Sequence, residues 1–189
     1  MGQNPHYFIG IPIAEELQGW LRNWQTEIEK HASYKQWTNE EDFHITLKFL
    51  GGMNATQIER IVELMDKLEP PERFYTEIGD LGFFGKKTQP RVVWADVEHI
   101  PSLLTLQNRI EEKVIQLGME EDNRMYRPHV TLAKKWKDPE SSLKSREELL
   151  AQLPGPMKQR MLVQQFHIYQ IEPQEDVKYK PIFTKNLKE

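Results

Sequence analysis

The sequence contains no cysteine among its 189 residues. A chain without thiols has no disulfide framework, no cysteine nucleophile, no iron–sulfur cluster and no cysteine-ligated zinc site. Positive charge is also scarce, because 25 Lys and Arg face 29 Asp and Glu and leave a formal net charge of −4. A protein that coats nucleic acid needs a basic face, so we expect any contact with nucleic acid to be local.

Long apolar runs and glycine-rich phosphate loops are missing as well. No run approaches the roughly 20 apolar residues of a membrane helix, and the opening segment MGQNPHYFIGIPIAEELQGW does not resemble a secretory signal. No GxGxxG or GxxxxGK[ST] segment follows a predicted strand, which argues against a dinucleotide fold and a P-loop. With 38% hydrophobic residues the chain can still bury a sizeable core. We therefore expect a cytoplasmic globular protein that contacts no membrane.

Hydrophobic periodicity predicts alternating strands and helices. The strands are expected at residues 6–13, 34–38, 43–50, 74–84, 91–97, 129–133, 160–171 and 179–187. The helices are expected after Pro12 and at residues 55–68, 101–117 and 141–153. Strands that come in adjacent pairs between helices are typical of an α+β protein with mainly antiparallel sheets. No low-complexity segment or long linker interrupts this order, so residues 1–189 are predicted to form one domain.

One tetrapeptide pattern, HxTx, occurs twice, at residues 44–47 and 129–132. In both copies the His is followed by Ile or Val, then Thr, then Leu, and ordinary residue usage gives this succession after a given His with a chance on the order of one in a thousand. Each copy lies in a predicted strand, where alternate residues share a face and lie roughly 6.6 Å apart. Each copy therefore offers one imidazole and one hydroxyl to a common surface, while its apolar residues point into a core. Repetition with the same alternation favours a functional site over two structural histidines.

Two imidazoles with ordinary pKa values near 6.5 can supply one base and one acid near pH 7. Two hydroxyl groups can hold phosphate oxygens. The pattern therefore predicts displacement at phosphorus without a metal, because two His supply only half the ligands of a typical zinc site. The other histidines lack the motif and are predicted to be structural or surface residues: His6, His31, His99 and His167.

At these residues the chain resembles the two-histidine (2H) phosphoesterase superfamily, specifically the LigT-like RNA 2′,3′-cyclic phosphodiesterases, also called 2′–5′ RNA ligases. The resemblance covers nearly the whole length, through HYFIGIPI, WTNEEDFHITLKFLG, LGFFGKKTQPRVVWADV, MYRPHVTLAKKW and FHIYQIEP. It implies a bilobal, pseudo-symmetric α+β fold in which two mainly antiparallel sheets flank a central cleft, with the helices outside. It also implies hydrolysis of RNA 2′,3′-cyclic phosphate ends to a 2′-phosphomonoester, and in some members the reverse 2′–5′ ligation.

The resemblance assigns roles to the four motif residues. His44 is expected to be the general acid to the leaving O3′ and His129 the general base, although the two roles could be exchanged. Thr46 and Thr131 are expected to hold the phosphate. The substrate is expected to be an RNA or oligonucleotide 3′ end, with no metal or other cofactor, no obligate protein partner and a monomeric protein.

Residues beside the motifs are candidate substrate contacts: Arg127, Lys134, Lys48, Arg91, Tyr126 and Phe49. Lys134 stands where relatives often carry Arg, and Lys lacks the planar fork that binds phosphate through two hydrogen bonds. The aromatic residues could stack on a base or, as is favoured for Phe49, pack in the core. The basic residues could equally be solvated strand charges. Asp42 could orient the ring of His44 or be an ordinary turn carboxylate.

Two alternative functions stay open. One is a cyclic phosphodiesterase with a non-RNA substrate, such as a cyclic phosphate of ADP-ribose. The other is a non-catalytic protein that binds RNA ends. Rates on cyclic mononucleotides, cyclic-ended RNA and the ADP-ribose compound distinguish them.

Overall fold

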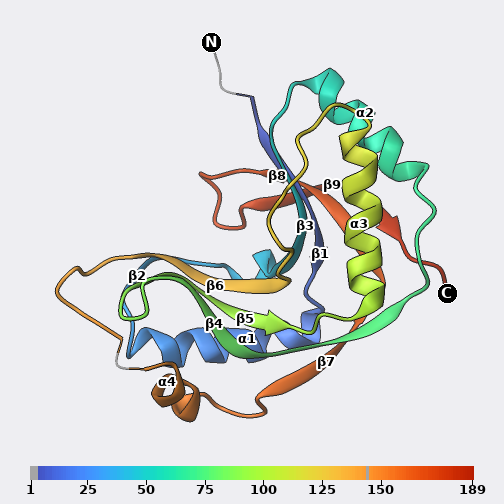
Figure 1. The fold of residues 1–189 in the computed structure, drawn as a ribbon. Coiled ribbons are helices and arrows are strands. Elements are labelled where there is room, and N and C mark those ends of the chain that lie inside the picture. Colours follow the sequence, from blue (N-terminus) through green and yellow to red (C-terminus); the bar gives the residue numbers. More distant parts are fainter. Residues whose placement is uncertain (1–3, 144) are drawn as a thin grey trace.

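The computed structural model describes residues 4–143 and 145–189. Within them, a nine-stranded sheet has the order β7-β4-β5-β6-β3-β1-β8-β9, and β2 pairs with β6 beside this path (Figure 1). The strands are β1 (His6–Pro12), β2 (Tyr34–Trp37), β3 (His44–Gly52), β4 (Phe74–Gly85), β5 (Pro90–Val97), β6 (His129–Trp136), β7 (Lys158–Val163), β8 (Gln165–Ile171) and β9 (Tyr179–Asn186). All these pairings are antiparallel, which confirms the predicted α+β class.

The helices are α1 (Glu15–Glu29), α2 (Ala55–Asp66), α3 (Pro101–Ile115) and α4 (Arg146–Gln152), and a 3₁₀ turn η1 (Glu40–Asp42) precedes β3. The helix predicted at 141–153 is therefore shorter than expected, and residue 144 of it lies outside the described residues. The start of α4 is fixed by Ser145, whose hydroxyl accepts a hydrogen bond from the Glu148 N–H. No helix in the described ranges is both long enough and apolar enough to span a bilayer.

The two halves of the sheet meet at β3 and β6. A single residue pair, Ile45–Val130, joins these strands. The strands β1, β8 and β9 extend the sheet beyond β3, while β5, β4 and β7 extend it beyond β6. The two sheets that were expected on either side of a cleft are thus continuous at their junction, and both HxTx motifs lie at this junction.

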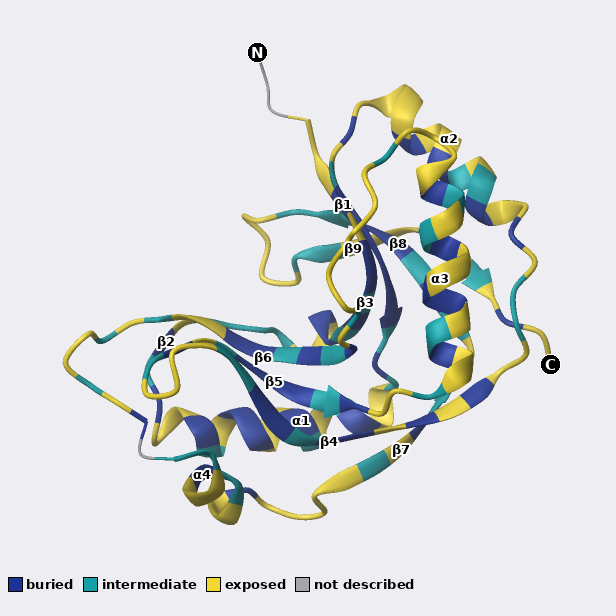
Figure 2. Cartoon of the chain, viewed as in Figure 1, coloured by how far each residue is buried: buried dark blue, intermediate teal, exposed yellow. Residues whose placement is uncertain are grey.

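Helices cover the core-facing side of the sheet. Helix α1 packs near β6, and α3 packs on β3 with α2 beside it (Figure 1). The buried residues of α1 and α3 follow the helical spacing seen in the sequence: Leu17, Leu21, Trp24 and Ile28, and Leu103, Leu106, Ile110 and Val114. Figure 2 shows these buried stripes facing the sheet. The apolar residues of both motifs belong to this core, which leaves the His and Thr side chains on the opposite face.

One strand prediction is wrong. Residues 160–171 were expected to form a single strand, but the chain breaks at Gln164 into β7, which pairs with β4, and β8, which pairs with β1. The segment therefore crosses from one half of the sheet to the other. The alternation of buried residues slips at the break, because Val163 and Phe166 are both buried and stand three positions apart. Regular alternation on each side of the slip made the two strands look like one.

Candidate active site

The imidazole of His44 is held by its own strand and by the turn before it. Its Nδ1–H donates to the main-chain carbonyl of Asp42 at 2.7 Å. A nitrogen bonded to a carbonyl must carry the proton, so Nε2 of the neutral ring is the free base. That Nε2 lies 3.1 Å from the hydroxyl of Thr46, the other polar residue of the motif. The ring is therefore oriented from behind and presents Nε2 beside a hydroxyl group.

His129 is held in the same way. Its Nδ1–H donates to the main-chain carbonyl of Arg127 at 2.7 Å, so its Nε2 is also the free base. Thr131 stands two residues further along β6 and is half-buried, as His129 is. The pairing of Ile45 with Val130 joins the second residues of the two motifs. Both imidazoles and both hydroxyls therefore lie on one face of adjacent strands, as the repeat predicted.

Burial dominates the electrostatics of both rings. It lowers the pKa of His44 to about 4; the carbonyl of Asp42 opposes this shift, and the charges of His129 and Lys134 add to it. Burial also lowers the pKa of His129, which the carbonyl of Arg127 and the carboxylate of Asp96 oppose. Both rings are therefore neutral near pH 7 in the free protein, whereas ordinary pKa values would leave one of them partly protonated. A bound anion would favour protonation of a neighbouring imidazole.

Aromatic rings that the sequence reasoning missed surround His44. The ring centroid of His44 lies 4.5 Å from that of Phe8 and 5.0 Å from that of Tyr179, with Tyr169 at 6.1 Å. Gly10 makes room for this cluster, because an added Cβ would lie 3.2 Å from the Phe8 ring and 3.4 Å from the His44 ring. Phe8 and Gly10 stand at alternate positions of β1, and strand alternation was the available signal for them.

His129 has its own aromatic wall. Its ring centroid lies 5.1 Å from that of Phe84 and 5.6 Å from that of Trp94. Trp94 packs across Gly82, where a Cβ would lie only 2.0 Å from the indole. The guanidinium carbon of Arg127 lies 4.9 Å from the centroid of the Trp94 ring. Arg127 is thus exposed beside the site, where its charge contributes to lowering the pKa of His129.

A β-bulge follows the first motif and changes which residues face the site. Gly10 pairs with Thr46 and Ile9 pairs with Lys48, so Leu47 is an extra residue in β3. Paired residues share a face of the sheet, and Lys48 therefore lies on the core side with Ile9. Phe49, which pairs with Phe8, returns to the face of His44 and Thr46.

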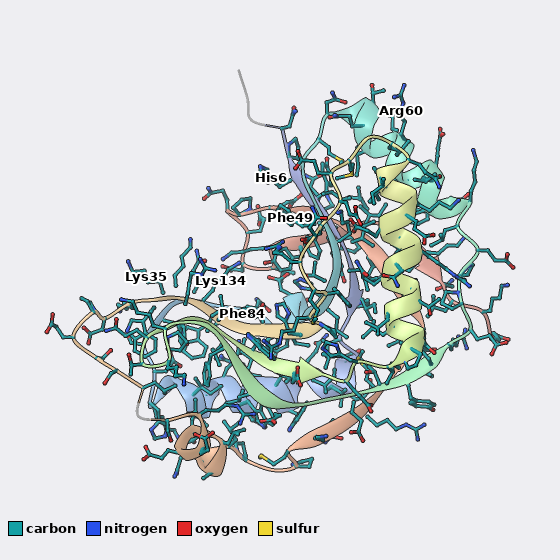
Figure 3. All side chains as sticks on the ribbon, viewed as in Figure 1. His6, Lys35, Phe49, Arg60, Phe84 and Lys134 are labelled. Carbon is teal, nitrogen blue, oxygen red and sulfur yellow. The ribbon has the colours of Figure 1, made fainter. Side chains whose placement is uncertain are left out.

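The second motif is followed by an equivalent bulge. Trp94 pairs with Thr131 and Val93 with Ala133, which leaves Leu132 as the extra residue in β6. Lys134, the fifth residue after His129, therefore shares the face of His129 and Thr131. The fifth residue after each motif histidine thus lies on the site face, and Figure 3 shows Lys134 on β6 and Phe49 on β3.

The structure contradicts the expectation that Lys48 contacts substrate. Its side chain is 7% exposed, and its ammonium group lies 2.6 Å from the carboxylate of Glu111 on α3. It also donates to the main-chain carbonyl of Glu120 at 3.1 Å. The expectation assumed uninterrupted alternation from His44, and the bulge at Leu47 reverses that alternation. Lys48 therefore ties β3 to α3 and the loop after it.

The core-packing interpretation favoured for Phe49 is also wrong. The side chain of Phe49 is 57% exposed, and its ring centroid lies 6.3 Å from that of His6. Tyr126 is half-buried, and its hydroxyl donates to the main-chain carbonyl of Thr46 at 3.0 Å, so this ring braces β3. Arg91 is exposed on β5, and within the described ranges its side chain makes no hydrogen bond to either motif.

Asp42 acts on His44 through its main chain, while its carboxylate has a separate role. The carboxylate is 4% exposed and accepts hydrogen bonds from the main-chain N–H groups of Lys178 and Tyr179, both at 2.9 Å. One residue thus orients His44 and fixes the start of β9. Among the residues that the structure describes, no three His, Cys, Asp or Glu side chains gather as a metal site would require.

Comparison with known proteins places this arrangement in a family. The family described as the AKAP7 2′5′ RNA ligase-like domain matches residues 5–186. The chain is 30% identical over 188 residues to the RNA 2′,3′-cyclic phosphodiesterase of Bacillus subtilis (strain 168), with 97% of each chain covered. It is 32% identical over 132 residues to a protein of the same name from Geobacillus stearothermophilus, which covers 69% of this chain and 42% of that protein.

Solved structures agree with this placement at the level of the fold. Escherichia coli LigT complexed with 3′-AMP is similar with a TM-score of 0.75 and 20% identity, over 98% of this chain and 100% of that chain. The protein TT0787 of Thermus thermophilus is similar with a TM-score of 0.76 and 21% identity, over 96% of this chain and 97% of that chain. The chain therefore belongs to the AKAP7 2′5′ RNA ligase-like family, among the LigT-like two-histidine phosphoesterases.

Proposed function

We propose that this protein hydrolyses RNA 2′,3′-cyclic phosphate ends to 2′-phosphomonoesters. The observation that carries the proposal is the pairing of the two HxTx strands through Ile45 and Val130, with both free Nε2 atoms on one face. The similarity to the Bacillus subtilis RNA 2′,3′-cyclic phosphodiesterase over nearly the whole chain supports the same reaction.

The reaction needs a general base, a general acid and groups that bind the phosphate. In our proposal Thr46 and Thr131 hold the non-bridging oxygens of the cyclic phosphate. The Nε2 of His129 takes a proton from water, and the water oxygen forms a bond to phosphorus. The bond between phosphorus and O3′ breaks, and the Nε2 of His44 gives its proton to O3′. The product is a 2′-phosphomonoester with a free 3′-hydroxyl, and exchange of the two histidine roles is the alternative assignment.

The substrate itself supplies the conditions for proton donation. Burial lowers the pKa of both rings and so disfavours the protonated imidazole that must act as the general acid. The negative charge of a bound phosphate stabilises an adjacent imidazolium. Binding of the substrate is therefore coupled to uptake of about one proton.

We further propose that Lys134, Arg127 and Phe49 contact the substrate. Lys134 and Phe49 share the face of the motifs, and Arg127 is exposed beside His129. We also propose that residues 1–189 act as one bilobal domain, as a monomer in the cytoplasm, on RNA or oligonucleotide 3′ ends and without a cofactor. The formal net charge of −4 fits a protein that holds only the end of an RNA.

The test is a substrate panel assayed with and without EDTA. It contains cyclic-ended RNA, a cyclic mononucleotide and the cyclic phosphate of ADP-ribose, with products identified by phosphorus NMR. We expect cyclic-ended RNA to yield a 2′-phosphate at a rate that EDTA does not change. Hydrolysis of the ADP-ribose compound alone would show that the protein is a cyclic phosphodiesterase with a non-RNA substrate. Binding of cyclic-ended RNA without hydrolysis would show that the protein is a non-catalytic protein that binds RNA ends.

A further inference from the structure

A pocket of about 240 Å³ is lined by Asp42 and Tyr179, two residues that contact His44. Strands β2 and β6 contribute residues to one side of its lining, and the segment from the end of β8 to the start of β9 contributes the other side. Polar and basic side chains dominate its lining, including Gln36, Asn39, Lys134, Lys135 and Lys178. Tyr179 also lines the pocket, and its ring centroid lies 5.0 Å from that of His44. The pocket is therefore separated from the motif histidine by one layer of side chains, Asp42 and Tyr179.

Asp42 links the pocket to the histidine. Its main-chain carbonyl accepts the Nδ1–H of His44, and its buried carboxylate accepts the main-chain N–H groups of Lys178 and Tyr179. Asp42 therefore positions both the pocket segment at Lys178 and Tyr179 and the ring of His44. This carboxylate acts on Lys134 through its charge, while its hydrogen bonds go to the main chain.

Three lysines converge on the pocket. Consecutive residues of a regular strand point to opposite faces, yet Lys134 and Lys135 both line it. The backbone explains this, because Lys135 has a φ of 65° and leaves the regular strand conformation. Burial lowers the pKa of Lys134, the charges of Lys135 and Lys178 lower it further, and the carboxylate of Asp42 opposes the shift. These charges therefore repel one another across a shared space.

The three ammonium groups form no ion pair in the part of the chain that the structure describes. Among the described residues, none of them lies within 4.0 Å of an Asp or Glu oxygen, although lysines elsewhere in the chain form such ion pairs. Asp176 also lines the pocket, and the contact it makes there is through its main-chain carbonyl, which accepts from Asn39 at 3.4 Å. Three cations that converge with one interacting carboxylate, Asp42, and form no ion pair, in a protein with a formal net charge of −4, indicate a site for an anion.

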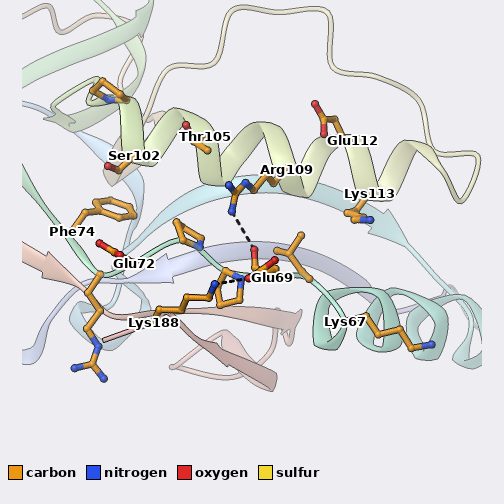
Figure 4. A pocket seen from close by; sticks show the side chains of 15 residues that line it. Lys67, Glu69, Glu72, Phe74, Ser102, Thr105, Arg109, Glu112, Lys113 and Lys188 are labelled. Carbon is orange, nitrogen blue, oxygen red and sulfur yellow. Dashed lines mark hydrogen bonds and ion pairs between the residues drawn. The ribbon is translucent and has the colours of Figure 1, made fainter.

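A second cavity, away from the motifs, differs in its charges. It has a volume of about 870 Å³ and lies between α3 and the segment after α2 (Figure 4). There Lys188 pairs with Glu69 at 2.5 Å, and Arg109 donates to the main-chain carbonyl of Glu69 at 3.2 Å. Basic groups in that cavity are thus partly neutralised by the protein itself, and neither HxTx motif lines it.

We propose that the lysine pocket binds the phosphate on the 5′ oxygen of the terminal nucleotide. In an RNA chain this phosphate is the diester that joins the last nucleotide to the one before it. Only the ribose separates it from the cyclic phosphate, which matches a pocket next to His44. The proposal rests on the proposed function, and it makes the enzyme prefer RNA ends over nucleosides that carry only the cyclic phosphate.

Three substrates test the proposal: a nucleoside 2′,3′-cyclic phosphate, the same compound with a 5′-phosphate, and a cyclic-ended dinucleotide. We expect both 5′-substituted compounds to exceed the first in kcat/KM by about tenfold or more, as for one charged hydrogen bond. Equal values for all three would overturn the pocket assignment and leave the proposed function intact. Hydrolysis of none of them would instead overturn the proposed function. A gain for the dinucleotide alone would assign the preference to the added base and contradict the proposal.

Substitutions test whether the preference for a 5′-phosphate comes from the pocket lysines. Lys178→Ala and Lys135→Ala should each lower the ratio of kcat/KM between the 5′-phosphorylated and unphosphorylated compounds about tenfold, and Lys178→Arg should retain most of it. Lys180→Ala is the matched control, because Lys180 is exposed nearby, lies 4.0 Å from Glu172 and does not line the pocket. An equal fall for Lys180→Ala would contradict the proposal. The salt dependence of the same ratio in the unmodified protein gives an independent readout, because phosphate contacts weaken as salt increases.

Discussion

Ile45 and Val130, the second residues of the two motifs, form the one residue pair that connects β3 to β6. Both side chains are 0% exposed, so the floor of the site is also the centre of the hydrophobic core. Because neighbouring positions on each strand point to the opposite face, this pair brings both HxTx histidines to one surface. The chemistry of the site therefore depends on the register of a single contact in the sheet.

The pH dependence should reflect the lowered pKa values of the two histidines. The active free enzyme carries one proton on the pair, so kcat/KM should rise above a pKa of about 4 and fall above a second pKa below the ordinary value of His. The kcat profile should lie at higher pH, because the bound phosphate raises the imidazole pKa. Initial rates from pH 4 to 9 measure both profiles. A maximum of kcat/KM at pH 8 would contradict the burial of these rings in neutral form.

Gly10 should be required for the position of His44. An added Cβ would lie 3.1 Å from the main-chain oxygen of Ile45 and 3.4 Å from the His44 ring. Gly10→Ala should therefore shift the imidazole by a few tenths of an ångström and lower kcat about tenfold. Gly19→Ala is the control, because nothing lies within 4 Å of its Cβ. In helix α1 that change should raise the free energy of unfolding by up to about 1 kcal/mol. Equal kcat values for the two variants would exclude this role of Gly10.

Lys48 should affect stability and leave substrate binding unaltered. Lys48→Met removes the charged partner of Glu111 and leaves that carboxylate with the main-chain N–H of Asp122 alone. The other carboxylate oxygen of Glu111 is already buried without a hydrogen bond among the described residues. Loss of one partner of a buried pair should lower the free energy of unfolding by about 3–5 kcal/mol. The double variant Lys48→Met/Glu111→Leu should recover most of this loss. Urea unfolding measures both effects. A raised KM with undiminished stability would restore Lys48 as a substrate contact.

Phe49 should act in binding, because its side chain is 57% exposed on the site face. Stacking of a base on an aromatic ring contributes roughly 1–3 kcal/mol. Phe49→Ala should therefore raise KM for cyclic-ended RNA by about fivefold or more, with little change in the unfolding midpoint. Phe49→Tyr keeps the ring and should retain the KM of the unmodified protein. If Phe49→Ala bound RNA normally, the exposed ring would have no part in recognition.

Strand alternation was sufficient to predict the central part of the site. His44 and Thr46, like His129 and Thr131, share a face because no irregularity separates them. Beyond each motif the same rule failed, because a bulge inserts one residue and reverses the alternation. A bulge depends on the partner strand, so the sequence of β3 alone does not reveal that Lys48 points to the core.

The aromatic walls and the histidine pKa values depend on contacts between distant segments. Phe8, Tyr169 and Tyr179 come from three strands and meet only when β1, β8 and β9 assemble beside β3. Burial of the imidazoles follows from that assembly. Gly10 carried a local signal, a glycine inside a strand, which often marks close approach of another group.

The most direct measurement is the single-turnover rate of cyclic-ended RNA hydrolysis by the unmodified protein and by its His44→Ala and His129→Ala variants, all in EDTA. General acid–base catalysis contributes typically 10²–10⁴-fold, so each variant should lose at least about a hundredfold in rate. Circular dichroism should show that each variant keeps its fold. We expect a 2′-phosphate product from the unmodified protein and almost none from either variant. Near-normal hydrolysis by either folded variant would contradict the two-histidine mechanism.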